Sequence, residues 1–351
     1  MNNEKIYYNL KKKAKYLYEI TYNDYRDDTY FETLDYDFTF GCSCVKNKNF
    51  FGRNFDFFFN DIPEFIVKVK RKNNRLASIG VAINGKLREK GMNKLVYDEE
   101  LEIIPNATMD GINECGVVSA INVVPGNDVP ELIGTNPEAK DLHVAFIPRF
   151  VLDNATSASK AIKLLKNRNI ITTPNVGNNI HVIISDTEKT YIVEFIGNKM
   201  IVQEKRGREQ IMTNYFCNLK GLTEHSHGVE RAEILKEHYT EGNTFIGMRK
   251  LLQKVKFSNV YRFNNKKEYY SEFATQSQIK NKKSEEWNEL LKLFDEAKKN
   301  YWISRAEDKR YPSNISNWFT THNSTYDIER KILRISVQEN YRKYFDFYIE
   351  Q

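Results

Sequence analysis

Short apolar runs separated by polar turns predict β-strands in several parts of the chain. The clearest pattern is a hairpin that pairs residues 42–45 with residues 50–55 across the polar turn 46–49. The other predicted strands have the same apolar character and lie at 117–124, 180–185, 190–196, 318–323, 331–337 and 344–349.

Apolar residues spaced three and four positions apart predict helices between these strands. The predicted helices span residues 142–152, 157–166, 229–238, 247–255 and 284–299. Residues 4–20 are also predicted to be helical and polar, and residues 21–40 to be extended. Strands at both ends of the chain, with helices in blocks between them, favour an α+β class with a layered antiparallel sheet core over a regular βαβ winding.

The composition is that of a folded protein. The sequence has no internal repeat and no low-complexity linker, so we expect one continuous domain after a leader. Of the 351 residues, 40% are hydrophobic and 28% are charged, close to the averages of globular proteins, which excludes a disordered chain. No apolar run approaches the roughly 18 residues that a membrane span needs. Residues 1–20 are charged throughout and lack the apolar segment of a secretion signal, so we expect a cytoplasmic location.

Neither the charge nor the spacing of histidines and cysteines indicates a nucleic acid or a metal as partner. The 53 basic residues exceed the 47 acidic residues by six, which is a mild excess. The histidines have no metal-ligand spacing apart from His225 and His227 in a polar loop, and four cysteines are too few for a disulfide scaffold. No glycine-rich phosphate loop is present, and we predict no metal and no cofactor.

The densest chemical pattern is GCSC at residues 41–44 followed by FGRNFD at residues 51–56. A neighbouring cation stabilises a thiolate, and Arg53 on the adjacent strand can supply that cation. If the chain were cut before Cys42, the new α-amino group, with a reference pKa of about 8, could take the thiol proton. Asp56 would then orient that amine. A surface hairpin with an ordinary arginine–aspartate pair would give the same pattern.

Further motifs follow in the same order along the chain: DGINECGV at 110–117, MTN at 212–214, Arg231 at a helix start, FTTHN at 319–323 and the aromatic segment 344–347. Together with the first segment, these motifs resemble the choloylglycine hydrolase family. That family consists of N-terminal nucleophile enzymes and includes bile salt hydrolases and penicillin V acylases. The resemblance runs from about Gly41 to the end of the chain.

The resemblance implies a four-layer αββα sandwich with two antiparallel sheets. It also implies hydrolysis of a linear amide carbon–nitrogen bond through a cysteine thioester. It implies that Cys42 is the nucleophile, that Arg53 holds the thiolate and that Asp56 binds the free amine. The oxyanion donors would be a backbone N–H at Asn113 and the side-chain amide of Asn214, and Arg231 would order the site. Phe57 and Phe59 suggest a pocket for the apolar acyl part of a small-molecule amide substrate.

The resemblance also bears on maturation. The interval from Cys42 to Arg53 is several residues shorter than in bile salt hydrolases, which leaves Cys44 as a rival nucleophile, but the small residue Gly41 before Cys42 favours Cys42. We predict a leader at residues 1–41 and an amidase domain at residues 42–351. The resemblance implies that autocatalytic proteolysis removes the leader, as in the acyltransferase-like and ceramidase-like relatives. The aromatic residues at 21–40 predict a plug over the acyl cleft. The alternative is a leader that packs on the far side of the body as an extra helix and strand.

Other functions remain open on sequence grounds. Acyl transfer to an amine would use the same thioester. A non-catalytic binding protein with this fold is an alternative from a different class. A cysteine–histidine dyad would need Cys115 or Cys217 beside a histidine. A homo-oligomer is also compatible with the sequence.

Overall fold

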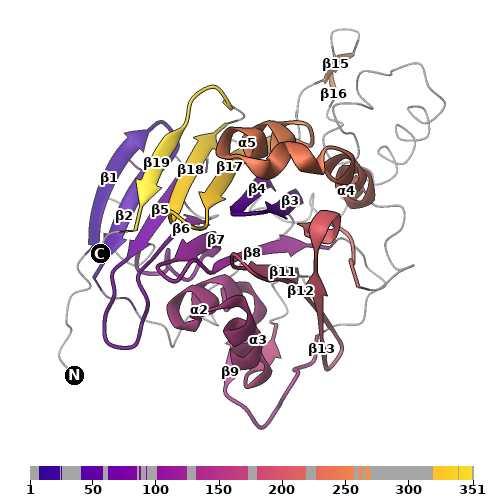
Figure 1. Ribbon diagram of the computed structural model, residues 1–351. Coiled ribbons are helices and arrows are strands. Elements are labelled where there is room, and N and C mark those ends of the chain that lie inside the picture. Colours follow the sequence, from indigo (N-terminus) through magenta and orange to yellow (C-terminus); the bar gives the residue numbers. More distant parts are fainter. Residues whose placement is uncertain are drawn as a thin grey trace.

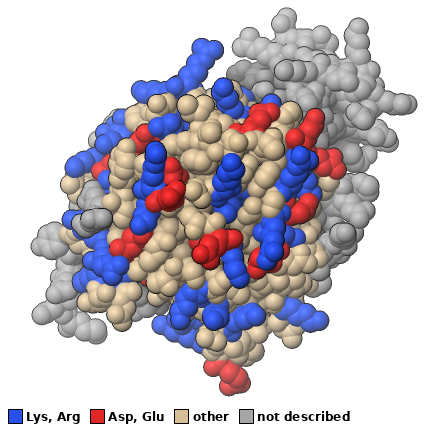
Figure 2. All heavy atoms as spheres, in the orientation of Figure 1, with Lys and Arg blue, Asp and Glu red and all other residues tan. Residues whose placement is uncertain are grey.

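The computed structural model describes residues 8–23, 25, 41–57, 62–84, 87, 92, 101–124, 132–172, 180–218, 227–256, 261–263, 266–268, 319–338 and 340–349. Within these residues, none of the helices has the length and apolar character needed to cross a membrane. On the face drawn in Figure 2, basic and acidic side chains are interspersed rather than separated by sign.

Two large β-sheets form the centre of the protein (Figure 1). The larger sheet has nine strands, in the order β1 (Tyr8–Ala14), β2 (Leu17–Tyr22), β5 (Glu64–Val69), β6 (Ser78–Ile83), β7 (Thr108–Asn113), β8 (Val118–Val123), β11 (Ile180–Ser185), β12 (Thr190–Ile196) and β13 (Lys199–Lys205). The smaller sheet has six strands, in the order β14 (Ile211–Met212), β3 (Gly41–Asn47), β4 (Phe50–Phe57), β17 (Phe319–Asp327), β18 (Ile332–Val337) and β19 (Phe345–Tyr348).

Neighbouring strands in both large sheets are antiparallel, with one exception. All pairs in the six-stranded sheet are antiparallel. In the nine-stranded sheet β2 and β5 are parallel and the remaining pairs are antiparallel. Two short pairs stand apart, β9 (Asp141–His143) with β10 (Asn169–Ile171) and β15 (Tyr261–Phe263) with β16 (Lys266–Glu268).

Helices cover the outer faces of the two large sheets. α2 (Ile147–Asn154) packs on β7 and β8, and α3 (Ala158–Lys166) packs on β11. On the opposite side of the molecule, α5 (Phe245–Gln253) packs on β4 and β17, and α4 (His227–Glu237) packs on β3 and β14. The inner faces meet where β3 lies against β8, around an apolar core that both sheets share. The predicted four-layer αββα sandwich is therefore confirmed (Figure 1).

Most predicted elements are present with shifted ends. The hairpin of residues 42–45 and 50–55 is β3 and β4, and the helix at 157–166 is α3. The helix predicted at 142–152 begins later, because residues 141–143 form β9 and residues 144–146 form the short 3-10 helix η1. α2 then begins at Ile147, with a proline in its first turn, where the missing N–H costs nothing. Two other 3-10 helices are η2 (Gly207–Glu209) and η3 (Tyr239–Asn243), and residues 284–299 lie outside the described residues.

The helix predicted for residues 4–20 is wrong, because the described part of that segment forms the antiparallel strands β1 and β2. β2 pairs on its other side with β5, and its residues Leu17, Ile20 and Tyr22 are fully buried. The lysine-rich β1 is the edge strand, where charged side chains discourage pairing with another chain. Pairing with a distant strand thus overrides the local helical pattern.

The predicted plug at residues 21–40 is described only at 21–23 and 25. Tyr22 donates a hydrogen bond to the Leu101 carbonyl, and Tyr25 donates one to the Asp153 carboxylate. Both rings belong to an apolar cluster separate from the cluster that contains Cys42. These two tyrosines therefore pack away from the nucleophile, and the plug stays a prediction for the residues that are not described.

Replacing Ile20 by alanine tests whether β2 is part of the folded body. The Ile20 side chain is fully buried, so Ile20→Ala should lower the free energy of unfolding by about 2–5 kcal/mol. Lys11→Ala, at an exposed position of β1, should change it by less than about 0.5 kcal/mol. Urea unfolding measures both values. Equally small effects would show that this hairpin contributes nothing to the core.

Candidate active site

The motif strand β4 directs its side chains alternately to its two faces, as strands do. Arg53 meets a carboxylate of the nine-stranded sheet, whereas Asp56 meets Arg231 on α4. Gly52 faces the helices, and a Cβ at this position would lie 2.5 Å from the Leu252 side chain of α5. The glycine therefore allows α5 to pack directly on the motif strand.

Arg53 holds the sulfur of Cys42. Cys42 pairs with Phe55, two residues beyond Arg53, so Cys42 and Arg53 lie on the same face of the β3–β4 hairpin. Arg53 Nη2 donates to Cys42 Sγ at 3.1 Å and to the Ile121 carbonyl at 2.7 Å. Arg53 Nη1 donates to Asp110 Oδ2 at 2.7 Å. The three side chains in this line, those of Cys42, Arg53 and Asp110, are fully buried.

A different side chain holds the nitrogen of the same cysteine. Cys42 N donates to Asn214 Oδ1 at 2.8 Å, and Asn214 Nδ2 donates to the Val123 carbonyl at 2.5 Å. Arg231 donates through Nη2 to the same Asn214 oxygen and through Nη1 to Asp56 Oδ2, the latter at 2.9 Å. Arg231 therefore links Asn214 to Asp56.

Asp56 is anchored on the helix side of the hairpin. Its Oδ1 accepts a hydrogen bond from Thr320 Oγ1 at 2.6 Å, and its Oδ2 accepts one from Arg231. In the strand register Asp56 lies opposite Gly41, the residue that precedes Cys42. Asp56 thus lies beside the Gly41–Cys42 bond.

The structure therefore brings together five of the six residues proposed for catalysis, and Asn113 is the exception. The backbone N–H of Asn113 donates to the Val117 carbonyl at 3.0 Å, and its Oδ1 accepts from the backbone N–H groups of Cys115 and Val117. Its Nδ2 donates to the carbonyls of Leu152 and Ala155. Asn113 ties the 113–117 turn to the end of α2. This corrects the expectation of an oxyanion donor, because its backbone N–H is already used within the turn.

Burial dominates the acid–base chemistry of the site. It raises the pKa of the Cys42 thiol to about 12, and Arg53 offsets this effect only in part. Burial also raises the pKa of Asp56, against the lowering effect of Arg231. At Asp110 the effect of burial is outweighed by Arg53 and His322, which hold the pKa of that carboxyl well below its ordinary value. In the uncut chain Cys42 is therefore a protonated thiol at neutral pH, and it needs a base to react.

The remaining candidates are partly described. Phe57 is buried in the same apolar cluster as Cys42, and Phe59 lies outside the described residues. The rival nucleophile Cys44 is also buried, with its Sγ 3.4 Å from Asn122 Oδ1. Its sulfur contacts a neutral amide, whereas the sulfur of Cys42 contacts a guanidinium.

Sequence reasoning missed three buried polar residues next to the site, Asp110, Asn122 and His322. Asn122 lies between the two residues of β8 whose carbonyls accept from Arg53 and Asn214. His322 Nε2 lies 3.4 Å from Asp110 Oδ2. The available signal was polarity inside predicted strands, because a polar side chain is buried in a sheet only when a partner satisfies it.

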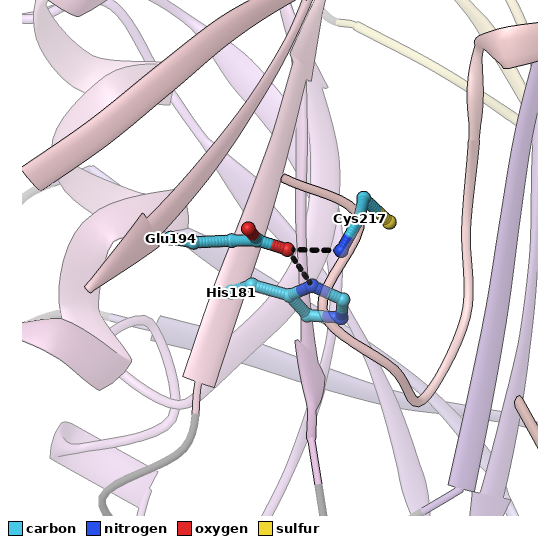
Figure 3. A group of neighbouring side chains, drawn as sticks. All are labelled: His181, Glu194 and Cys217. Atoms are coloured by element: carbon cyan, nitrogen blue, oxygen red, sulfur yellow. Dashed lines mark hydrogen bonds and ion pairs between the residues drawn. The ribbon is translucent and has the colours of Figure 1, made fainter. Parts of the chain in front are cut away.

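A second cluster, His181, Glu194 and Cys217, offers three metal-ligand types within 4.8 Å of one another in the described part of the chain (Figure 3). His181 Nδ1 lies 3.4 Å from Glu194 Oε1. Glu194 also accepts the backbone N–H of Cys217 at 2.6 Å and that of Asn218 at 2.9 Å. The Cys217 sulfur points away from the other two side chains (Figure 3). The cluster thus anchors the segment after Asn214 to β12, and we assign no metal to it.

The same cluster bears on the cysteine–histidine alternative. Burial and the neighbouring Glu194 raise the pKa of Cys217 to about 12. Its sulfur contacts the backbone carbonyls of Ile211 and Tyr215, at 3.9 and 3.7 Å. Among the described residues, no guanidinium contacts the Cys217 sulfur, in contrast to the sulfur of Cys42.

Comparisons with known proteins give a family and several structural likenesses. The chain resembles the structure of a mutant conjugated bile acid hydrolase from Clostridium perfringens, with 16% identity, 88% of this chain and 92% of the other covered, and a TM-score of 0.46. A second variant of that hydrolase gives 15% identity, the same coverage and a TM-score of 0.44. Penicillin V acylase from Agrobacterium tumefaciens gives 17% identity, coverage of 85% and 83%, and a TM-score of 0.38. A search of curated protein sequences gave no match.

The family assignment rests on the sequence itself. The model of the linear amide C–N hydrolases, choloylglycine hydrolase family, matches residues 42–219, which is just over half of the chain. The match begins at Cys42 and includes Arg53, Asp56 and Asn214. The chain therefore belongs to the choloylglycine hydrolase family of linear amide C–N hydrolases.

Proposed function

We propose that this chain hydrolyses a linear amide through a thioester on Cys42, after the Gly41–Cys42 bond is cut. The observation that carries the proposal is that separate side chains hold the two atoms of Cys42 that the reaction uses. Arg53 contacts Sγ at 3.1 Å, and Asn214 contacts N at 2.8 Å. The family supplies the class of reaction, hydrolysis of a linear amide.

Cleavage of the Gly41–Cys42 bond creates the base. In the uncut chain the nitrogen of Cys42 belongs to a peptide bond and cannot take up a proton. Hydrolysis of that bond converts it to an α-amino group with a reference pKa of about 8, next to the thiol of the same residue. The amine takes the thiol proton, and the permanently charged Arg53 stabilises the thiolate. Asp56, beside the cleaved bond, orients the amine.

Acylation and deacylation then use the same groups. The Cys42 sulfur attacks the amide carbon, a carbon–sulfur bond forms, and the carbonyl oxygen becomes an oxyanion. Asn214 Nδ2 stabilises this oxyanion with one of its two N–H groups, while the other donates to the Val123 carbonyl. The carbon–nitrogen bond breaks as the α-amine returns its proton to the leaving amine. Water then adds to the thioester and gives a proton to the α-amine. The carbon–sulfur bond breaks, which releases a carboxylic acid and restores Cys42.

The site also supports an apolar acyl group in the substrate. Phe57 is buried in the apolar cluster that contains Cys42, and its ring stacks on that of Phe55 with centroids 5.7 Å apart. Aromatic rings in such a cluster bind apolar groups more readily than charged ones. We therefore propose a small-molecule amide with an apolar acyl part.

Cys42→Ala should abolish both chain cleavage and amide hydrolysis, because it removes the sulfur and leaves no nucleophile. Cys44→Ala is the matched control and should retain most of both. Intact-mass measurement locates the amino terminus, and release of amine from penicillin V, a glycine-conjugated bile acid and an N-acyl amino acid measures hydrolysis. The reverse result, with Cys44→Ala inactive and Cys42→Ala active, would contradict the assignment of the nucleophile.

Residues 1–41 should remain bound after cleavage. β1 and β2 are strands of the nine-stranded sheet, and Leu17, Ile20 and Tyr22 lie in its core. The two pieces should therefore elute together in size-exclusion chromatography and separate only in denaturant. A folded, active enzyme from which residues 1–41 are lost would show that this hairpin is dispensable.

Asn214→Ala should lower kcat by about 100- to 1000-fold, the usual loss when one oxyanion donor is removed. Asn218→Ala, on the same segment but bonded to the Ile192 carbonyl, is the matched control and should leave kcat nearly unchanged. Circular dichroism and Tm verify that both variants fold. Folded Asn214→Ala enzyme with a kcat within a few fold of wild type would rule out this role.

A further inference from the structure

Four buried charged side chains form a line that ends at Cys42. Glu64 on β5 has Oε2 2.9 Å from His322 Nδ1 on β17. The other ring nitrogen of His322 lies 3.4 Å from Asp110 Oδ2 on β7, and the same oxygen lies 2.7 Å from Arg53 Nη1 on β4. All four side chains are at most 1% exposed. The line therefore runs between the two sheets, with Glu64 and Asp110 on the nine-stranded sheet and His322 and Arg53 on the six-stranded sheet.

Asp110 is the junction of this line. Its Oδ2 faces Arg53 and His322, and its Oδ1 accepts hydrogen bonds from Ser324 Oγ, at 2.9 Å, and from the Tyr326 hydroxyl. A carboxylate that is bonded on both oxygens has little freedom to rotate. The position of Asp110 therefore determines where the Arg53 guanidinium lies.

The His322 ring is also fixed by packing. It stacks on Phe55, with centroids 5.2 Å apart and an interplanar angle of 11°. The Arg53 guanidinium lies 4.8 Å from the centroid of the Phe55 ring. Phe55 thus contacts both cations, and movement of one of them would disturb the packing of the other.

The charges around His322 favour a proton on its ring. The charged groups that face its ring are Glu64 and Asp110, with Arg53 beyond Asp110. With a neutral imidazole, two buried carboxylates would share a single arginine, which is costly in a medium of low polarity. Burial alone would lower the pKa of His322, but the two carboxylates outweigh it and raise the pKa to about 9.

We propose that His322, as an imidazolium between Glu64 and Asp110, is a positioning residue that fixes Asp110 and thereby holds Arg53 against the Cys42 sulfur. The inference deepens the proposed function and rests on it for the role of Cys42. The charge line itself does not depend on catalysis, so it can be tested independently.

The central experiment compares His322→Gln, Glu64→Gln and the double variant. His322→Gln leaves Glu64 buried without a cation and should lower Tm strongly. The double variant removes both charges and should recover most of that loss. If His322 positions Arg53, kcat of the folded double variant should still be at least about tenfold below wild type with KM little changed. Recovery of both Tm and kcat to wild-type values would show a purely structural ion pair and overturn the proposal.

His181→Gln is the matched control. His181 is also fully buried and also faces a glutamate, Glu194, and none of its contacts within the described residues reaches Arg53. Glutamine keeps a donor for the carboxylate. This variant should retain kcat even if its Tm falls, and an equal loss of kcat would show that any buried histidine has the same effect.

Two readouts do not use activity. In the 15N spectrum of histidine-labelled wild-type protein, the His322 signal, identified by its absence from the double variant, should be that of an imidazolium at pH 7.5. Because the folded-state pKa is raised from 6.5 to about 9, the stability due to this charge is complete below pH 6.5 and lost as the pH rises through about 9. The stability difference between wild type and the double variant should therefore shrink over that range. A neutral His322 at pH 7.5 would overturn the proposal, whereas an active Cys42→Ala enzyme with an imidazolium at His322 would overturn the proposed function alone.

Discussion

The structure depends on the burial of one guanidinium, that of Arg53. Because it is removed from water, this group must find its counter-charge and its hydrogen-bond acceptors inside the protein. Its partners belong to different strands: the Cys42 sulfur on β3, the Asp110 carboxylate on β7 and the Ile121 carbonyl on β8. Burial of Arg53 therefore requires both sheets to be paired in register and packed face to face. The contacts that join the two sheets are thus the contacts that build the site.

A second buried ion pair lies on the other face of the same hairpin. Arg231 binds Asp56 and also Asn214, which holds the nitrogen of Cys42. The alternation of side chains along β4 separates the two ion pairs, so that the sulfur of Cys42 faces one arginine while its nitrogen is bound through the other. This division explains why a single short motif can supply both the group that stabilises a thiolate and the group that lies beside the future amine.

The sequence predicts those elements and contacts that depend on residues close together in the chain. The β3–β4 hairpin and the placement of Arg53 beside the Cys42 sulfur follow from a local pattern. The segment at residues 4–20 was mistaken for a helix because β2 acquires its strand partner, β5, only through the fold. Asn113 was misjudged because an asparagine that closes a turn and one that donates to an oxyanion have the same sequence signature. The role of His322 could not be predicted, because Glu64 and Asp110 are distant from it in the sequence and contact it only in the folded protein.

The central claim is that the sulfur of Cys42, which Arg53 contacts, carries the acyl group during the reaction. The most direct measurement is peptide mass analysis of enzyme quenched in acid during turnover of a linear amide. The account predicts an added acyl mass on the peptide that begins at Cys42, removable by hydroxylamine and absent from enzyme without substrate. Acyl mass on Cys44, or none on any cysteine while amine is released in a rapid burst, would contradict it.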